Sequence, residues 1–293
     1  MSVATPEEVV TKAFVREVDL TPFGFAGKLA LITLDNGLDY NRPNTIGPEG
    51  LHALNGAIDQ ALASGADAIG VTGKPFIFAA GADLSGVSSV SDSAQAKAFG
   101  KLGHDVFRRL GECGKPTFAF INGLALGGGL EIGLHCNYRT LASTAFVALP
   151  EVFLGLVPGW GGATLLPRLI GREKAAKVIM VNALNNNTML KANEALELGI
   201  VDSVYLPADF LEKSRSFAAS ILSGKTRIER KDHTGDDAAW SAAAEIASSA
   251  KKKKYGDAPI DAPRLAEKLM RESRTATRDS GFDAEDEALN ELV

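Results

Sequence analysis

The sequence predicts an α/β fold in which helices cover a sheet of parallel strands. Through the first 220 residues, short apolar runs alternate with segments whose apolar residues have helical spacing. This order is typical of layered α/β proteins, because parallel strands need crossover connections. The chain has 293 residues, 45% of them hydrophobic and 23% charged, so it can bury a substantial core without disulfides.

The expected strands are apolar runs rich in β-forming residues, and the first three end at a turn signal that contains glycine. They are Lys28–Leu34, Ala68–Thr72, Pro116–Ile121 and Tyr138–Leu141. The expected helices have apolar residues three or four positions apart. They are Pro48–Ala63, Ser93–Leu110 and a helix that starts within Gly128–Leu134.

The composition changes after Leu222, which we take as a domain boundary. Gly224–Gly256 contains few large apolar residues, so we expect helical pieces there without a compact core. Pro263–Arg278 and the acidic stretch after it have the pattern of amphipathic helices. Residues 223–293 are therefore expected to form a polar, mainly helical C-terminal region, for trimerisation or as a linker.

Charge and composition exclude several classes of protein. The net charge of −5 argues against nucleic-acid binding, which favours a basic surface. The longest uncharged runs are too short to span a membrane, and the N-terminus lacks a signal peptide pattern. Two cysteines make no disulfide framework, so we expect a cytoplasmic location. The four histidines have no metal-ligand spacing, so no metal is expected.

A triple glycine marks the first candidate site. Gly127, Gly128 and Gly129 precede an apparent helix, and free N–H groups at a helix N-terminus form a partial positive site. Glycines let a substrate carbonyl approach these groups, as an oxyanion hole requires. Glu131 lies in the first helical turn and Glu151 twenty residues later. Two carboxylates in different environments can serve as acid and base near neutral pH.

A second segment, Phe76–Gly86, runs from a β-rich stretch into small residues. Small residues after a strand let the backbone bend and expose its N–H groups. Taken alone, this segment is best explained as a tight strand-to-helix turn.

Four ordered motifs together resemble the crotonase (enoyl-CoA hydratase/isomerase) superfamily. They are Ala80-Gly81-Ala82-Asp83-Leu84, Asn122-Gly123-x-Ala125-x-Gly127-Gly128-Gly129-x-Glu131, Pro150-Glu151-x-x-x-Gly155-x-x-Pro158-Gly159-x-Gly161-Gly162, and Glu194-Ala195-Leu196-x-x-Gly199-Ile200-Val201-Asp202. The resemblance covers residues 28 to 222. It implies a crotonase-like ββα superhelix and assigns residues 1–222 to a crotonase-like catalytic core.

The resemblance also implies roles for individual residues. The backbone N–H groups of Ala82 and Gly128 would form an oxyanion hole for an acyl thioester. Glu131 and Glu151 match the two glutamates of the hydratases, where the first mainly activates water and the second mainly delivers a proton. Gly159 matches a position whose backbone helps to hold that water.

Other residues are expected around the substrate, and two differ from the family pattern. Ala80, Gly81 and Gly127 would line the binding site, while Asp83 would cap the turn. Trp160 replaces a usually small residue, and it either lines the pocket or packs. The loop Asn41–Gly47 stands where hydratases hold coenzyme A, but Thr45-Ile46-Gly47 replaces their usual Asn-Ala-Leu.

The resemblance predicts an enoyl-CoA hydratase of fatty-acid β-oxidation with no cofactor, since coenzyme A is part of the acyl-CoA substrate. The alternatives are a Δ3,Δ2-enoyl-CoA isomerase and a non-catalytic binding protein of this fold. A homotrimer or hexamer is implied. The chain also resembles the hydratase part of bifunctional hydratase/3-hydroxyacyl-CoA dehydrogenases, which implies fusion or association with a dehydrogenase.

Overall fold

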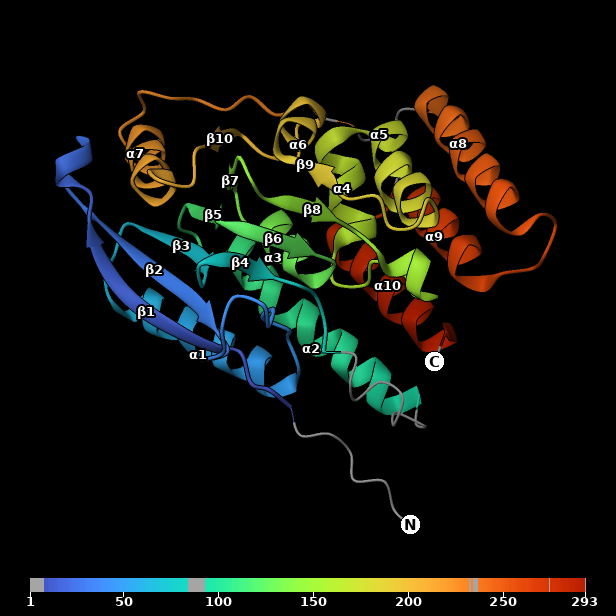
Figure 1. Ribbon diagram of the computed structural model, residues 1–293, viewed down its shortest axis with the longest axis horizontal. Helices are drawn as coiled ribbons and strands as arrows, with labels where there is room; N and C mark the ends of the chain where they lie inside the picture. Colours follow the sequence, from blue (N-terminus) through green and yellow to red (C-terminus); the bar gives the residue numbers. More distant parts are fainter. Residues whose placement is uncertain (1–7, 84–92, 232, 234–236, 274, 293) are drawn as a thin grey trace, which may run out of the picture.

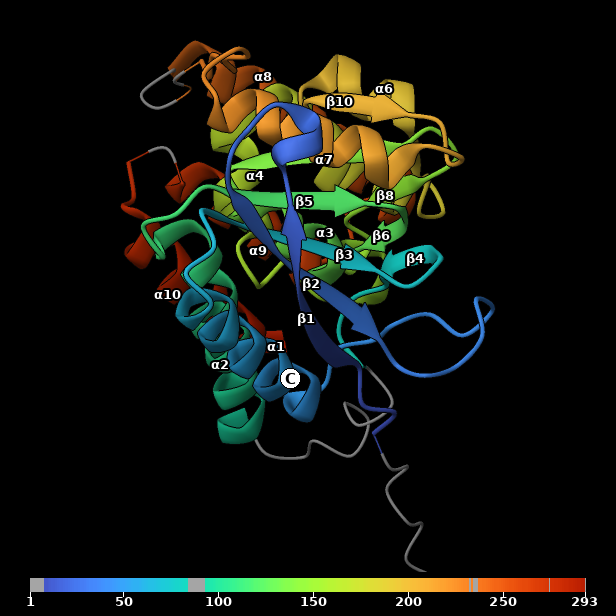
Figure 2. The same ribbon diagram turned by 90° about the vertical axis from the view of Figure 1, so that its left-hand side faces the viewer.

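Two sheets and the helices around them make up the computed structural model, which describes residues 8–83, 93–231, 233, 237–273 and 275–292 (Figure 1). The larger sheet has the order β1-β2-β3-β5-β7-β10, and only β1 and β2 pair antiparallel. Its strands are β1 (Lys12–Asp19), β2 (Lys28–Asp35), β3 (Ala68–Gly73), β5 (Thr117–Ile121), β7 (Tyr138–Ala142) and β10 (Ser203–Tyr205). Figure 2 shows β2, β3 and β5 running in the same direction.

The smaller sheet has the order β4-β6-β8-β9, and only its last pair is antiparallel. Its strands are β4 (Phe76–Ala79), β6 (Gly123–Leu126), β8 (Phe146–Ala148) and β9 (Leu190–Lys191). The helices are α1 (Pro48–Ala63), α2 (Ser93–Glu112), α3 (Gly128–His135), α4 (Gly162–Ile170), α5 (Arg172–Ala176), α6 (Ala192–Leu198), α7 (Phe210–Leu222), α8 (Asp237–Tyr255), α9 (Asp261–Glu272) and α10 (Arg278–Leu292). The described ranges also contain two short 3-10 helices, η1 (Thr21–Phe23) and η3 (Glu151–Leu154), and a π-helix, η4 (Lys177–Asn182).

A ββα unit repeats along the chain and confirms the predicted superhelix. In each unit one strand enters the larger sheet, the next enters the smaller sheet, and a helix returns. The units are β3-β4-α2, β5-β6-α3 and β7-β8-α4. Because the units stack, the ends of β4, β6 and β8 meet at one edge, where α3 begins.

The corners between the two sheets need glycine and one asparagine. A side chain on Gly73 would overlap the backbone of Ile77, and one on Gly123 would overlap the carbonyl of Phe76. Asn122 joins the corners: its Oδ1 accepts a hydrogen bond from Gly73 N at 3.0 Å, and its Nδ2 donates to the Lys74 carbonyl at 2.6 Å. The Asn-Gly pair therefore fixes one ββα unit against the next.

Most elements predicted from hydrophobic spacing are confirmed. The helix Pro48–Ala63 has the predicted bounds, and the predicted strands and the other helices of the core agree with the structure to within about two residues. Strand β1 was not predicted, because its charged residues alternate with half-buried ones at the edge of the sheet. Residues 84–92 lie outside the described residues. They include Leu84 of the first motif and the last three residues of the Phe76–Gly86 segment.

The described residues of the C-terminal region form the helices α8, α9 and α10 at one end of the molecule, opposite β1 and β2 (Figure 1). Helix α8 occupies most of the polar stretch Gly224–Gly256 and packs against α5 and η4 by burying Ala243 and Ala247. Small residues therefore make a contact that the scarcity of large apolar residues did not suggest. Helix α10 packs against α2, α4 and α9. No helix within the described ranges is long and apolar enough to cross a membrane.

We expect Asn122→Ala to lower the free energy of unfolding by about 1–3 kcal/mol, because the N–H of the buried Gly73 loses its acceptor. Urea titration followed by circular dichroism measures this. Asn41→Ala is the matched control, since Asn41 is exposed and its side chain makes no hydrogen bond to the described residues. Equal stability of the two variants would contradict the role given to Asn122.

Candidate active site

The site is built around the start of α3. Gly127 has a positive φ of 51° and donates its N–H to the Ala148 carbonyl at 2.9 Å. A Cβ on Gly127 would lie 2.5 Å from Glu151 Oε1, and a Cβ on Gly128 would lie 2.5 Å from Trp160 Cε3. These close approaches require glycine, so the amide end of α3 faces Glu151 and Trp160 without side chains in between.

The turn after β4 lies against the same glycines. Ile46 holds this turn: its N–H donates to the Gly81 carbonyl at 2.9 Å, and its carbonyl accepts from Asp83 N at 3.0 Å. A Cβ on Gly81 would lie 3.7 Å from Gly128 N, so the two segments touch. The backbone of Asp83 therefore ties the turn to the neighbouring loop.

Two amide donors remain unused at this junction. Within the described part of the chain, neither Ala82 N–H nor Gly128 N–H donates a hydrogen bond to another group of the protein. Preorganised N–H groups from two segments suit an oxygen atom on which negative charge develops. The loop around Asn44 supports the arrangement, because the buried Asn44 carbonyl accepts from Ala80 N at 2.8 Å.

Ten of the residues singled out from the sequence line one cavity of about 300 Å³, whereas Gly129 and the loop Asn41–Gly47 do not line it. The ten residues are Ala80, Gly81, Ala82, Asp83, Gly127, Gly128, Glu131, Glu151, Gly159 and Trp160. The remaining wall is mostly apolar and includes Phe99 of α2 and Leu289 of α10. The C-terminal region thus contributes to the cavity, which sequence reasoning did not anticipate.

Glu131 points its carboxylate at the backbone that enters α4. Its Oε1 accepts hydrogen bonds from Trp160 N and Gly162 N, each at 2.8 Å, and the residue is 2% exposed. Burial, and then the charge of Glu285, raises the pKa of Glu131 to about 7 against the opposing effect of the two amides. Glu131 is therefore able to exchange a proton near neutral pH.

Glu151 lies in the short helix η3 after β8. Although the residue is only partly buried, its Oε2 is enclosed and has no hydrogen-bond partner among the described residues. Burial, and then the charge of Glu131, raises the pKa of Glu151 well above its usual value. Glu131 Oε1 accepts hydrogen bonds from two amide N–H groups and Glu151 Oε2 accepts none from the described residues, so the two carboxyl groups lie in different environments.

Trp160 has both of the roles that the sequence left open. It lines the cavity, and its ring packs edge-on against Phe99 and Phe107, with centroids 5.1 and 5.3 Å away. Gly159 beside it has no room for a side chain, because a Cβ there would overlap Leu289. Trp160 therefore fixes the width of the cavity between α2 and the start of α3.

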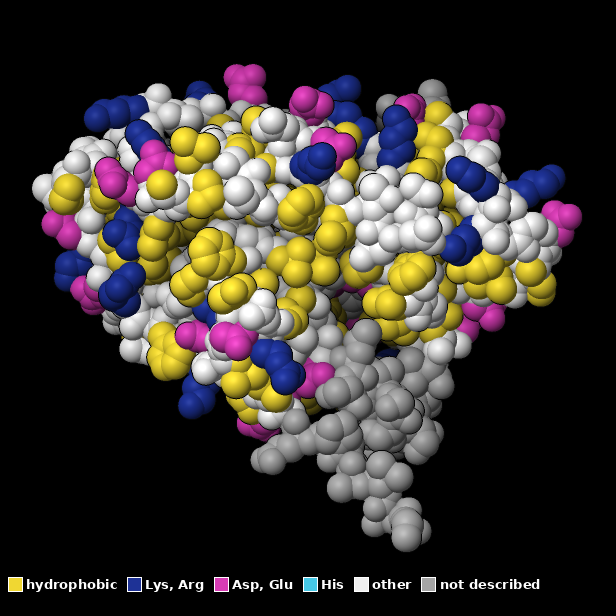
Figure 3. Space-filling view, viewed as in Figure 1, with side chains coloured by type: hydrophobic (Ala, Val, Ile, Leu, Met, Phe, Trp, Pro, Cys, Tyr) yellow, Lys and Arg dark blue, Asp and Glu magenta, His cyan; other side chains and the backbone are white. Residues whose placement is uncertain are grey.

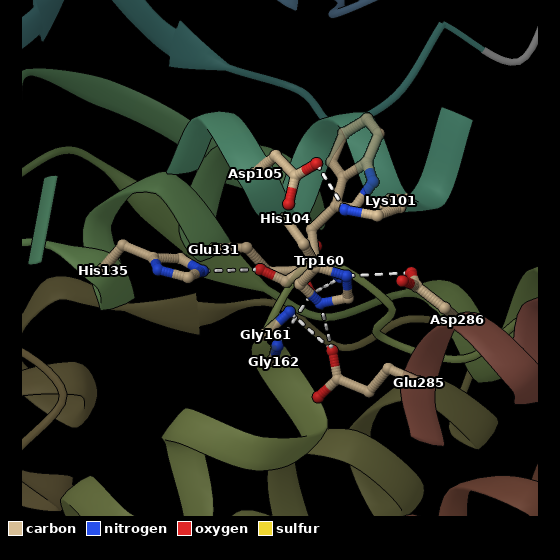
Figure 4. Close-up of polar contacts among 10 residues, drawn as sticks. All are labelled: Lys101, His104, Asp105, Glu131, His135, Trp160, Gly161, Gly162, Glu285 and Asp286. Carbon is tan, nitrogen blue, oxygen red and sulfur yellow. Dashed lines mark hydrogen bonds and ion pairs between the residues drawn. The ribbon is translucent and has the colours of Figure 1, made fainter. Parts of the chain in front are cut away.

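A buried charged cluster behind Glu131 was missed from the sequence (Figure 4). His104 of α2 contacts Glu285 Oε2 at 3.0 Å and Asp286 Oδ1 at 2.9 Å. Burial alone would lower the pKa of His104, but hydrogen bonds to Asp286 and Glu285 raise it to about 9. Glu285 also accepts a hydrogen bond from Gly161 N at 2.6 Å.

The sequence signals for this cluster were weak. The sequence favours a packing or surface role for each histidine, and an acidic C-terminal stretch resembles an exposed helix face. Phe282, three residues before Glu285, was the available sign that this face is buried, since it stacks on His104. Within the described ranges, no group of three or more His, Cys, Asp or Glu residues is arranged to hold a metal ion.

The chain is similar to several known proteins. A family model described as enoyl-CoA hydratase/isomerase matches residues 25–255. A short-chain-enoyl-CoA hydratase of Clostridium acetobutylicum is 36% identical over 200 residues, which cover 67% of this chain and 73% of that protein. A crotonyl-CoA hydratase of Syntrophomonas wolfei is 40% identical over 146 residues, 50% of this chain and 54% of that one.

A third relative is longer. The glyoxysomal fatty acid beta-oxidation multifunctional protein MFP-a of Brassica napus is 36% identical over 200 residues, but these cover only 26% of its length and 67% of this chain. Among solved structures, an enoyl-CoA hydratase from Bacillus anthracis has a TM-score of 0.61 at 25% identity and covers 94% of this chain and 89% of its own.

The family match spans most of the chain, and the ββα superhelix agrees with it. We conclude that the chain belongs to the enoyl-CoA hydratase/isomerase family, the crotonase superfamily.

Proposed function

We propose that this protein is an enoyl-CoA hydratase that adds water across the 2,3 double bond of 2-enoyl-CoA thioesters. The observation that carries the proposal is the placement of two glutamates with different environments, Glu131 buried and Glu151 partly buried, on one cavity at the start of α3. The relatives named as short-chain-enoyl-CoA and crotonyl-CoA hydratases support the same reaction.

In this proposal the thioester oxygen lies between Ala82 N–H and Gly128 N–H. Addition of water to C3 moves electrons toward that oxygen, and the two donors stabilise the enolate-like charge. One such donor contributes roughly 3–4 kcal/mol to transition-state stabilisation. The partial positive charge at the N-terminus of α3 acts in the same direction.

The two glutamates then complete the reaction. Ionised Glu131 takes a proton from water while the water oxygen bonds to C3. Protonated Glu151 gives its proton to C2, and the carbonyl re-forms. The net change adds H and OH to the double bond. The two glutamates still share one proton, which now lies on Glu131 and returns to Glu151 through solvent.

The isomerase alternative needs a single carboxyl group that moves a proton between C2 and C4. The second glutamate facing the cavity favours hydration, because it provides for water activation as well. A non-catalytic binding role rests on Lys251–Lys254 alone. In α8, Lys254 lies over the Phe153 ring at 5.8 Å and contacts Asn186, which is an ordinary packing role.

We further propose an acyl-CoA substrate without a separate cofactor, and association or fusion with a 3-hydroxyacyl-CoA dehydrogenase. Support for the second part comes from the multifunctional relative, of which this chain spans about a quarter. A cytoplasmic location is supported by two free cysteines, Cys113 and Cys136.

Homotrimers or hexamers are proposed from an exposed apolar face. Figure 3 shows hydrophobic side chains gathered across the middle of the face where β4 and β8 lie. Phe76 is 63% and Tyr40 61% exposed, and their rings pack edge-on at 6.2 Å. Contiguous apolar surface of this kind is typical of subunit interfaces.

We expect Glu131→Gln and Glu151→Gln each to reduce the turnover of crotonyl-CoA by at least about 10², because each change removes a positioned acid or base but keeps its shape. Loss of absorbance of the conjugated thioester measures the rate. Glu197→Gln, an exposed glutamate of α6, is the matched control and should keep wild-type activity. A folded Glu131 or Glu151 variant with full activity would refute the mechanism.

The rate should rise with pH through about 7, because Glu131 must lose its proton before it can activate water and its pKa is raised to about 7. At higher pH the rate should fall as Glu151 loses the proton that it delivers. Because the two carboxyl groups are coupled, the rise and the fall of the rate with pH, the two limbs of the profile, belong to the Glu131–Glu151 pair and not to either residue alone. The residual activity of Glu131→Gln should lack the limb near pH 7, and persistence of that limb would assign it to another group.

The oxyanion hole should be visible in the bound thioester. We expect the infrared carbonyl band of a ¹³C-labelled 2-enoyl-CoA to move to lower wavenumber when it binds the inactive Glu131→Gln/Glu151→Gln double variant, because two N–H donors weaken the C=O bond. The same thioester free in buffer is the reference. An unshifted band in the saturated complex would place the carbonyl elsewhere.

A further inference from the structure

The backbone segment Trp160–Gly162 is held from two sides by buried carboxylates (Figure 4). Trp160 N–H and Gly162 N–H donate to Glu131 Oε1, each at 2.8 Å. The N–H of Gly161 between them donates to Glu285 Oε2 at 2.6 Å. Because these three amides are consecutive, moving Glu285 moves the two donors that orient Glu131.

Contacts with His104 of helix α2 hold Glu285 in place. The ring of His104 in α2 contacts Glu285 through Nε2 and Asp286 through Nδ1. Phe282, one turn earlier in α10, stacks on the same ring with centroids 4.7 Å apart. Glu285 is 0% and His104 3% exposed, so water does not screen the pair.

Helix docking alone does not explain a glutamate at this position. Burying an ion pair costs desolvation energy that its attraction barely offsets, and an apolar residue often stabilises such a contact as well. Glu285 Oε1 is also buried without a hydrogen-bond partner among the described residues, which adds to the cost.

We propose that Glu285 is a positioning residue of the active site: it fixes the Trp160–Gly162 backbone that orients Glu131 and places a third carboxylate behind the two proposed catalytic glutamates. The proposal rests on the proposed hydratase function. Glu285 does not line the cavity, so its effect reaches the substrate only through Glu131 and this backbone.

The charge of Glu285 has a defined effect on Glu131. The titratable and charged groups that face Glu131 or its partners come from four elements: Glu285 and Asp286 of α10, His104 and Lys101 of α2, Glu151 of η3, and His135 of α3. His135 is neutral at pH 7, because burial lowers its pKa to about 3. After burial, the Glu285 charge is the main cause of the raised pKa of Glu131, and His104 opposes it.

Two variants separate charge from position. Glu285→Gln keeps an oxygen that accepts from Gly161 N–H but removes the charge, so the rise of kcat with pH should move to lower pH while plateau kcat stays near wild type. Glu285→Ala removes both, so kcat should also fall, by up to about 10²-fold, with a smaller change in KM. The assay is crotonyl-CoA hydration by the full chain across pH.

Two neighbouring residues serve as controls. Glu287→Gln makes the same chemical change at an exposed position of α10 and should leave the profile unchanged. Asp286→Asn weakens the hold on His104 but leaves the hydrogen bond between Gly161 and Glu285 in place, so it should lower the melting temperature and act on the pH profile only indirectly, through His104, and less than Glu285→Gln does.

A second readout keeps the proposal separate from the proposed reaction. Infrared difference spectra of each protein against its Glu131→Gln counterpart follow the Glu131 carboxyl directly, and its midpoint should fall in Glu285→Gln even if crotonyl-CoA is not a substrate. The proposal is overturned if Glu285→Gln leaves both the midpoint and the pH profile unchanged, or if Asp286→Asn reproduces its effects. If Glu285→Ala does not fold, Glu285→Gln alone decides.

Discussion

Three consecutive backbone amides bind two buried carboxylates on opposite sides, and the geometry of the active site depends on this sharing. Glu131 comes from the core at the start of α3, and Glu285 comes from the C-terminal helix α10. A carboxylate so buried is tolerated only when donors reach it. The Trp160–Gly162 amides meet that need for both residues, and in doing so they join the ββα core to the helices that follow it.

Much of the fold and of the site could be predicted, because their causes are local. The alternation of apolar runs and helical spacing indicates the ββα order, and the Asn122-Gly123 corner marks the passage between sheets. The triple glycine predicts an open helix start. Glu131 and Glu151 follow at positions that the stacked units bring to one cavity.

The remaining features depend on partners distant in sequence. Glu285 and Asp286 look like surface charges until His104, about 180 residues earlier, is placed beside them. Strand β1 lies at a sheet edge, and its exposed charged residues obscure the hydrophobic pattern of a strand. Helix α8 packs through alanines, which give only a weak signal in hydrophobic patterning. The two glutamates also differ in the hydrogen bonds that they accept. The donors to Glu131 are backbone N–H groups of another segment, and their position cannot be read from residue types.

The contact between Gly128 and Trp160 couples two properties that would otherwise vary separately. Residue 128 cannot gain even a methyl group while the indole ring lies 2.5 Å from the place of its Cβ. The ring is in turn held by Phe99 and Phe107. To accept a substrate of a different size, this protein would therefore first need a substitution at position 160 or in α2. Gly128 could be replaced only after the indole ring had been removed. The pocket therefore cannot be enlarged independently of the glycine turn at the start of α3, and the order of the substitutions matters.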